Sequence, residues 1–324
     1  MTVTYLRPIT SEVRTPLAVS LPELAHYAGY LFDTRILGKR KPLVGGINIT
    51  SYCNLTCKHC PYANPDFLPR EHLPLAKVRA MWERFLANGV RILFMQGGEP
   101  VMWRDAEAGW DFDRLVDEAK RHFFKVACVT NAILPITNRC DLVWISVDGS
   151  PKYHEAVRGE GSYETMVRNI AESRNPNLHA NVTLSKINVA DIEDNVANIA
   201  RQMPRLKAIS FNFQIPYPGV EEYALSFEER AEAVDRIVAL KKKGHRILNS
   251  AGALRLMLKP GWNRTHWLVQ LGHPDGTLVD GCGVRLIAPE VCEKCGYGVM
   301  AEVQAIYQGK PSSILAGFKL FRVI

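Results

Sequence analysis

Short apolar segments alternate with longer amphipathic ones from residue 44 to about residue 245. Six of the short segments are rich in β-branched or aromatic residues, which is typical of buried strands. They run from Val44 to Ile49, Arg91 to Met95, Lys125 to Thr130, Leu142 to Val147, Ala180 to Leu184 and Ala208 to Phe213. Helical spacing of apolar residues recurs between them, near 75–88, 112–122, 163–174 and 192–202. This order predicts an α/β fold with a parallel sheet, curved into a partial (β/α)6 TIM-like barrel.

The pattern also divides the chain into three predicted domains. Residues 1–43 form an N-terminal helical extension, in which Leu24, Ala28 and Leu31 share one helical face. Residues 44–250 form the barrel, and its last helix opens at the capping-box sequence from Ser226 to Glu229. Glycine, proline and cysteine become frequent afterwards, so residues 251–324 are expected to be a small Cys-rich C-terminal module with a terminal helix.

Composition excludes several classes of protein. The 324 residues include 40 Lys and Arg against 33 Asp and Glu, and 47% are hydrophobic, so the chain can bury a large core. The net charge of +7 is dispersed, and no basic stripe with interleaved aromatics predicts nucleic-acid binding. The first residues do not resemble a signal peptide, and no run of 18 apolar residues occurs. We therefore expect a cytoplasmic protein.

Six of the eight cysteines fall into two tight groups. Cys53, Cys57 and Cys60 follow the first predicted strand directly. Three thiolates on one loop can bind three irons of a cubane cluster and leave the fourth iron open, whereas zinc normally needs a fourth Cys or His at finger-like spacing. The lone Cys128 and Cys140 are expected to be buried in the core.

The spacing Cys-x3-Cys-x2-Cys after the first strand of a βα barrel resembles the signature of radical S-adenosylmethionine (SAM) enzymes. A second motif strengthens the resemblance, because the family carries a Gly-Gly-Glu-Pro sequence at the end of its second strand. Here Gly97, Gly98, Glu99 and Pro100 follow the strand that ends at Met95. The resemblance implies that this segment binds the methionine amino group, since backbone and carboxylate oxygens accept hydrogen bonds from an ammonium group.

Polar residues at later strand ends match the family in the same order. The resemblance implies that they contact the ribose or the methionine carboxylate of SAM. The SAM-contacting residues that we predict are Thr130 and Asn131 after the third strand, Ser146 and Asp148 after the fourth, Arg158 in the His154-x3-Arg-Gly segment, and Ser185 and Asn188 after the fifth. His59, just before the third cysteine, stands where family members often present an aromatic residue to adenine.

The second cysteine group comprises Cys282, Cys292 and Cys295. It resembles the auxiliary-cluster modules of the family, called twitch or SPASM, and the preceding His273-Pro-Asp-Gly-Thr277 resembles the hairpin that introduces them. The resemblance implies a second [4Fe–4S] cluster, whose fourth iron would face substrate, a non-cysteine residue or a lone cysteine. A zinc knuckle or unliganded thiols are the alternatives.

The resemblance implies the initiating chemistry. A [4Fe–4S] cluster on Cys53, Cys57 and Cys60 would bind SAM at its open iron, and an electron from a reductant such as flavodoxin or ferredoxin would release a 5′-deoxyadenosyl radical. That radical would abstract hydrogen from a substrate or add to it.

The sequence leaves the substrate unknown. Our first hypothesis is a small molecule, which includes a lipid-like one, because the basic N-terminal segment and the apolar C-terminus could lie on a membrane surface. The commoner arrangement for such terminal helices is packing against the outside or the open end of the barrel. A maturase that modifies a peptide or protein is the first alternative. A non-catalytic iron–sulfur redox protein is the second.

Overall fold

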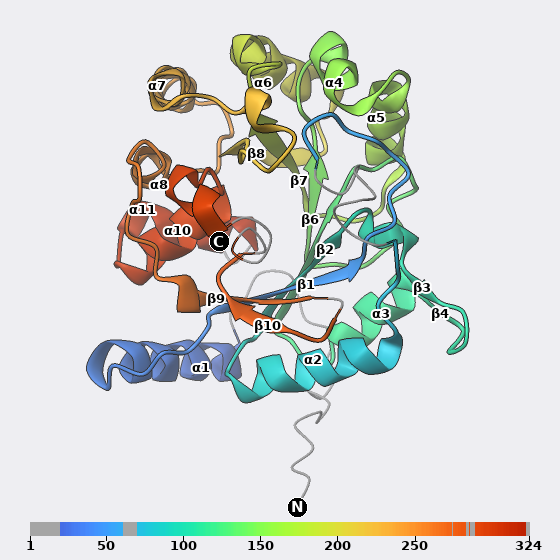
Figure 1. The fold of residues 1–324 in the computed structure, drawn as a ribbon, viewed down its shortest axis with the longest axis vertical. Coiled ribbons are helices and arrows are strands. Elements are labelled where there is room, and N and C mark those ends of the chain that lie inside the picture. Colours follow the sequence, from blue (N-terminus) through green and yellow to red (C-terminus); the bar gives the residue numbers. More distant parts are fainter. Residues whose placement is uncertain (1–19, 61–69, 274, 283–284, 286–288, 322–324) are drawn as a thin grey trace, which may run out of the picture.

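The computed structural model describes residues 20–60, 70–273, 275–282, 285 and 289–321. Its centre is an eight-stranded sheet in the order β10-β9-β1-β2-β5-β6-β7-β8 (Figure 1). Six neighbouring strands are parallel and correspond to the six predicted ones. They are β1 (Val44–Thr50), β2 (Ile92–Gly97), β5 (Lys125–Thr130), β6 (Leu142–Ser146), β7 (Leu178–Leu184) and β8 (Leu206–Phe213). The parallel α/β prediction is therefore confirmed.

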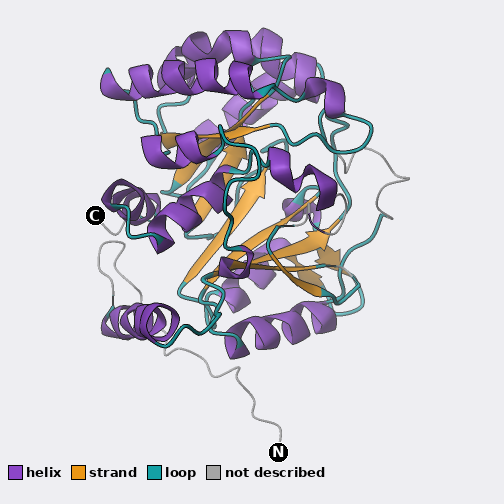
Figure 2. Ribbon diagram, turned by 60° about the vertical axis from the view of Figure 1, so that its left-hand side comes forward, coloured by secondary structure: helices purple, strands orange, loops and turns teal. Residues whose placement is uncertain are grey.

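Helices connect the parallel strands and cover the sheet, which appears between layers of helix in Figure 2. They are α2 (Leu75–Ala87), α3 (Phe112–Ala119), α4 (Pro151–Arg158), α5 (Ser162–Glu172), α6 (Ile192–Gln202) and α7 (Phe227–Lys242). The capping box predicted at the start of α7 is present, because Ser226 and Glu229 each accept a hydrogen bond from the other's backbone N–H. A small antiparallel pair, β3 (Arg104–Asp105) and β4 (Trp110–Asp111), precedes α3.

The C-terminal part contributes to the same sheet. Strand β9 (Val269–Gly272) pairs in parallel with β1, and β10 (Leu278–Asp280) pairs antiparallel with β9. Sequence patterns missed β9 because it has only four residues. The predicted hairpin lies between these two strands, where the His273 N–H donates to the Thr277 carbonyl at 2.9 Å. Its Pro274 lies outside the described residues.

Three further helices form a group beside β8, namely α8 (Ala251–Leu256), α10 (Gly298–Tyr307) and α11 (Pro311–Leu320). At the other end of the chain, α1 (Leu21–Leu31) continues directly into a π-helical turn, η1 (Phe32–Ile36). Segment 251–324 therefore extends the sheet of the barrel as well as adding helices to it. The division into three domains stays a prediction.

Candidate active site

The first cysteine group lies on the loop that leaves β1 at its carboxyl end. Cys57 is buried, whereas Cys53 and Cys60 are half-buried. The loop turns back on itself where the Cys60 N–H donates to the Cys57 carbonyl at 3.1 Å. It is also attached to α4, because the Lys58 N–H donates to the Val157 carbonyl at 3.0 Å. This position is the edge of a parallel barrel at which active sites are built.

Two side chains from outside the loop reach the sulfur atoms, one just after the end of β5 and one from the last residue of α4. Asn131 Nδ2 lies 3.7 Å from Cys53 Sγ, and Arg158 Nη1 lies 3.9 Å from Cys57 Sγ. Burial raises the pKa of both thiols, while the nearby Arg158 charge lowers it in part. The imidazole Nδ1 of His59, on the same loop, is buried with no hydrogen-bond partner among the described residues. Thiols on one loop, with N–H donors beside them and an unpartnered polar atom among them, fit an iron–sulfur cluster with a bound ligand.

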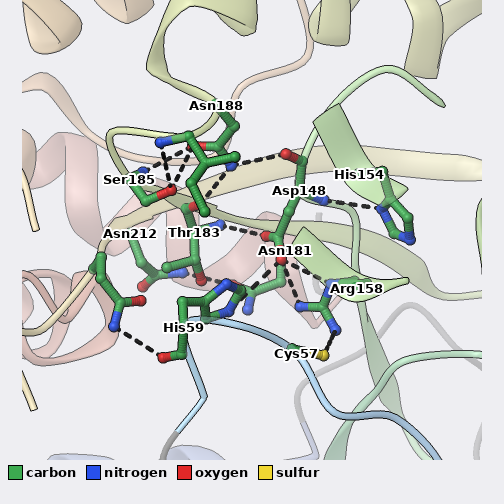
Figure 3. A network of polar contacts seen from close by, with 12 residues as sticks. Cys57, His59, Asp148, His154, Arg158, Asn181, Thr183, Ser185, Asn188 and Asn212 are labelled. Atoms are coloured by element: carbon green, nitrogen blue, oxygen red, sulfur yellow. Dashed lines mark hydrogen bonds and ion pairs between the residues drawn. The ribbon is translucent and has the colours of Figure 1, made fainter. Parts of the chain in front are cut away.

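Arg158 and Asp148 form a buried ion pair beside Cys57 (Figure 3). Arg158 Nε and Nη2 each lie 2.7 Å from Asp148 Oδ2, and Asp148 Oδ1 accepts the Thr183 N–H at 2.9 Å. Although burial raises the pKa of Asp148, the guanidinium lowers it below its usual value. Burial opposes the charge of Arg158 too, but Asp148 and Cys57 raise its pKa overall. Both groups are therefore charged, and the cation is held against Cys57.

His59, on the cysteine loop, lies next to the Arg158–Asp148 ion pair. Its Nε2 lies 3.8 Å from Asp148 Oδ2, while burial lowers the pKa of the imidazole to about 4. The ring is therefore neutral at pH 7, and its side chain packs against the ion pair.

The Gly97–Gly98 segment runs against the beginning of the cysteine loop. A Cβ on Gly97 would lie 2.1 Å from the Thr50 carbonyl oxygen, and one on Gly98 would lie 2.3 Å from that of Tyr52. Gly97 also has a φ of +148°, which L side chains rarely adopt. The close approach lets the Gly98 and Glu99 N–H groups donate to Thr50 and Tyr52, each at 2.8 Å. Glycine is thus required here so that β2 can hold the loop in place.

Glu99 joins the end of β2 to the end of β5. Its buried carboxylate accepts hydrogen bonds from Thr130 Oγ1 and the Asn131 N–H, each at 2.7 Å, and from the Val101 N–H at 3.2 Å. Burial raises the pKa of this carboxyl, and these bonds oppose the rise. We expected Glu99 and Thr130 to contact SAM directly. In the structure the side-chain oxygens of both residues are hydrogen-bonded to each other and to backbone N–H groups, and this orients Asn131 toward Cys53. Pro100 begins the short helix η3 (Pro100–Met102).

Ser185 and Asn188 are buried behind the ion pair. Asn188 Nδ2 donates to the carbonyls of Asp148 at 2.7 Å and Thr183 at 2.9 Å, and its Oδ1 accepts the Ser185 N–H at 2.7 Å. Figure 3 shows Asp148 between Asn188 and Arg158. These two predicted SAM contacts therefore fix the backbone of Asp148, and Ser146 is likewise buried at the end of β6. A direct role of these three residues in binding stays a prediction.

Several polar residues near the site were missed by sequence reasoning. Gln214 follows β8, and its Nε2 donates to the carbonyls of His59 at 3.0 Å and Ile215 at 2.8 Å. Asn212 links β8 to β7 by donating to Asn181 Oδ1 at 2.7 Å. The available signal was an amide within or just after an otherwise apolar strand, at the same carboxyl edge as the cysteine loop.

Comparison with known proteins agrees with this geometry. The family model described as the Radical SAM superfamily matches residues 47–199, which include the cysteine loop, the Gly-Gly-Glu-Pro segment and the ion pair. Residues 47–199 are therefore a radical SAM domain. Radical SAM proteins of this superfamily carry a [4Fe–4S] cluster and use SAM.

Individual relatives cover different parts of this radical SAM protein. Pre-heme d1 synthase of Dinoroseobacter shibae is 33% identical over 154 residues, which are 44% of this chain but only 36% of that enzyme. SuiB of Streptococcus suis, solved with S-adenosylmethionine bound, aligns with a TM-score of 0.62 at 14% identity, over 92% of this chain and 73% of its own. The enzyme anSMEcpe, solved with AdoMet bound, aligns with a TM-score of 0.56 at 16% identity, over 74% of each chain. At such identities the two structures show a shared fold.

The second cysteine group of this radical SAM protein surrounds one hollow. Cys282, Cys292 and Cys295 line it together with Arg264, His266, Ile215 and Met300. Cys295 is buried, and its N–H donates to the Cys292 carbonyl at 3.0 Å. The structure thus brings these three thiols to one hollow, whereas their binding of a cluster stays a prediction. Cys128 and Cys140 lie in the hydrophobic core as expected. Within the described ranges, no three His, Cys, Asp or Glu side chains are arranged to hold a single metal ion.

In the part of the chain that the structure describes, no helix combines the length and the apolar character needed to cross a bilayer.

Proposed function

We propose that this chain is a radical SAM enzyme whose reaction begins at Cys53, Cys57 and Cys60. These cysteines would hold a [4Fe–4S] cluster with SAM at its open iron, and the pair would supply one-electron cleavage of the S–C5′ bond and thus a 5′-deoxyadenosyl radical that abstracts hydrogen from substrate or adds to it. The observation that carries this proposal is the placement of Arg158 and Asn131 against two of the sulfurs, at the carboxyl edge of the barrel.

The protein's own part is to position and to balance charge. Arg158 offsets the negative charge that Cys57 carries as a thiolate. Asp148 holds the guanidinium in place through two hydrogen bonds. Glu99 orients Asn131 in the same indirect way. Both carboxylates are positioning residues in this proposal, and the methionine amino group is assigned to the backbone edge at Gly97 and Gly98.

A small molecule is the substrate class that we favour. The support is the name of the sequence relative, pre-heme d1 synthase, which matches at 33% identity. A maturase that modifies a peptide remains the second candidate, because SuiB has also been solved bound to its precursor peptide SuiA and aligns over 96% of this chain. The redox-carrier alternative is disfavoured, because a protein that does not bind SAM does not require the close approach of Gly97 and Gly98 to the cysteine loop.

The decisive experiment is anaerobic reconstitution with iron and sulfide, followed by addition of SAM and dithionite and chromatographic measurement of 5′-deoxyadenosine. We expect product from the wild type, product at the background level from Cys57→Ala, and near-normal product from the core control Cys140→Ala. A fully loaded wild-type protein that gives no product, with or without candidate substrates, would contradict the proposal.

We also infer that Cys282, Cys292 and Cys295 bind a second [4Fe–4S] cluster. The support is that the three cysteines line one hollow together with the Arg264 guanidinium and the His266 imidazole. Arg264 Nε, Arg264 Nη1 and His266 Nδ1 are buried and have no hydrogen-bond partner among the described residues. An anionic cluster would provide acceptors for these nitrogen atoms. The wild type should bind about eight irons per chain, and Cys292→Ala about four, while still producing 5′-deoxyadenosine. Equal iron content in the wild type and in Cys292→Ala would contradict this inference.

A further inference from the structure

The segment formed by α1 and η1 buries its polar side and exposes its apolar side. Glu23, Tyr30 and Thr34 are 2%, 6% and 4% exposed, respectively. The Tyr30 hydroxyl donates to the Lys41 carbonyl at 3.1 Å, and Glu23 Oε1 lies 3.4 Å from Lys125 Nζ at the start of β5. A surface helix normally places such residues outward, so this helix is inverted with respect to the usual arrangement.

The outward face carries most of the large exposed hydrophobic residues of the described chain. Sequence spacing predicted Leu24, Ala28 and Leu31 on one face, and the structure turns that face to solvent. The exposed fractions are 82% for Leu21, 60% for Leu24, 51% for Leu31, 56% for Phe32, 70% for Ile36 and 51% for Leu37. Contiguous apolar patches of this kind mark interaction surfaces in soluble proteins.

The charge around this patch has one sign. Arg35, Lys39 and Arg40 are exposed, whereas the two acidic residues between positions 20 and 41 are not: Glu23 is buried, and Asp33 is half-buried in contact with Lys39 and Lys41. The exposed face therefore combines leucine, isoleucine and phenylalanine with cations and has no exposed carboxylate. This is the composition of helices that lie in the interface of anionic bilayers.

The C-terminal helix α11 extends the patch. Arg35 donates to the Tyr307 carbonyl at the end of α10 and lies over the Tyr307 ring, which brings η1 beside the turn that leads into α11. Leu315 and Phe318 of α11 are 44% and 43% exposed, and Lys319 is exposed next to them. Figure 1 shows α1 and α11 on the same side of the molecule.

We propose that the face formed by α1, η1 and α11 docks on an anionic membrane surface. A second copy of this chain is a poorer occupant, because a twofold interface would set the same patch on both subunits and offer Arg35, Lys39 and Arg40 no exposed carboxylate from that patch. Phospholipid headgroups supply the negative charge that this face lacks, and the acyl boundary covers its leucines. The proposal does not depend on the reaction catalysed.

The test is co-flotation of the full chain with lipid vesicles. We expect binding to vesicles of phosphatidylcholine and phosphatidylglycerol at 3:1, weaker binding to phosphatidylcholine alone, and loss of binding as salt is raised. The double variant Leu24→Asp/Leu31→Asp changes exposed side chains only and should lower the partition coefficient at least about tenfold. Its production of 5′-deoxyadenosine should match that of the wild type.

A matched control separates this patch from overall charge. Lys207→Ala/Lys243→Ala removes the same two units of charge at exposed positions elsewhere and should float almost as well as the wild type. Failure of the wild type to float with anionic vesicles would overturn the proposal, as would equal flotation of the Leu24→Asp/Leu31→Asp variant. A concentration-dependent dimer that this variant abolishes, without flotation of the wild type, would assign the patch to a second copy instead.

Discussion

The two cysteine groups each have a buried arginine beside them, but the two arginines are neutralised differently. Arg158 is paired with the Asp148 carboxylate, and this raises its pKa despite burial. Arg230 on α7 is 1% exposed, and its acceptors among the described residues are neutral, namely the carbonyls of Lys294 at 2.9 Å, Cys295 at 3.4 Å and Met257 at 3.5 Å. Burial lowers its pKa to about 10.

The difference shows how complete each region is without a ligand. The first region contains its own counter-charge, so its geometry is fixed by protein groups alone. The second contains Arg230 and the partly unsatisfied Arg264 beside three thiols, and no carboxylate of the described residues is bonded to either arginine. Thiolates that bind a cluster would supply the missing negative charge, so we expect the second region to depend more on its ligand.

The largest effect should follow from breaking the ion pair of the first region. Arg158→Met leaves the Asp148 carboxylate buried without its cation, which costs about 3–5 kcal/mol of unfolding free energy. Adding Asp148→Asn should restore part of that loss, because the uncompensated charge is then removed. Urea denaturation of the two single variants and the double variant measures the coupling. Additive losses would mean that the two groups do not stabilise each other.

A smaller loss is expected in the second region. Arg230→Met leaves three carbonyls without a donor but no buried charge, so we expect a cost of about 1–3 kcal/mol in unfolding free energy. The partly exposed pair of Arg236 and Glu193 provides the control, since Arg236→Met should cost less than about 1 kcal/mol. If Arg230→Met were as costly as Arg158→Met, the contrast between the two regions would be wrong.

The third effect depends on pH and belongs to the first region. Burial lowers the pKa of His154 to about 3, and its Nδ1 accepts the Asp148 N–H at 3.3 Å, so the ring is neutral in the fold. The unfolded chain binds this proton near pH 6.5, so stability is complete above that pH and falls as pH drops toward 3. The loss is at most about 1.4 kcal/mol per pH unit. Denaturation midpoints at pH 7, 6 and 5 should fall less steeply for His154→Gln, and an unchanged slope would exclude this source.

Local sequence was sufficient for the elements that repeat. Strand β1 is a buried apolar run, and α7 begins at a capping box, so neither needs distant contacts to be recognised. Strand β9 escaped notice because its four residues become a strand only by pairing with β1, which lies more than 200 residues away in the chain. Glu99 was correctly singled out, but its bonds to Thr130 and Asn131 depend on how β2 and β5 are arranged.

The sequence by itself determined the chemistry and the order of the elements. Thiol spacing, glycine pairs and strand periodicity are local properties, because they follow from the reach of a loop and the geometry of one strand. Tertiary structure alone decided which groups meet. It placed Arg158 between Cys57 and Asp148, set Arg230 against backbone carbonyls, and turned the apolar face of α1 outward. Burial and charge pairing depend on residues far apart in the chain, and no local pattern encodes them.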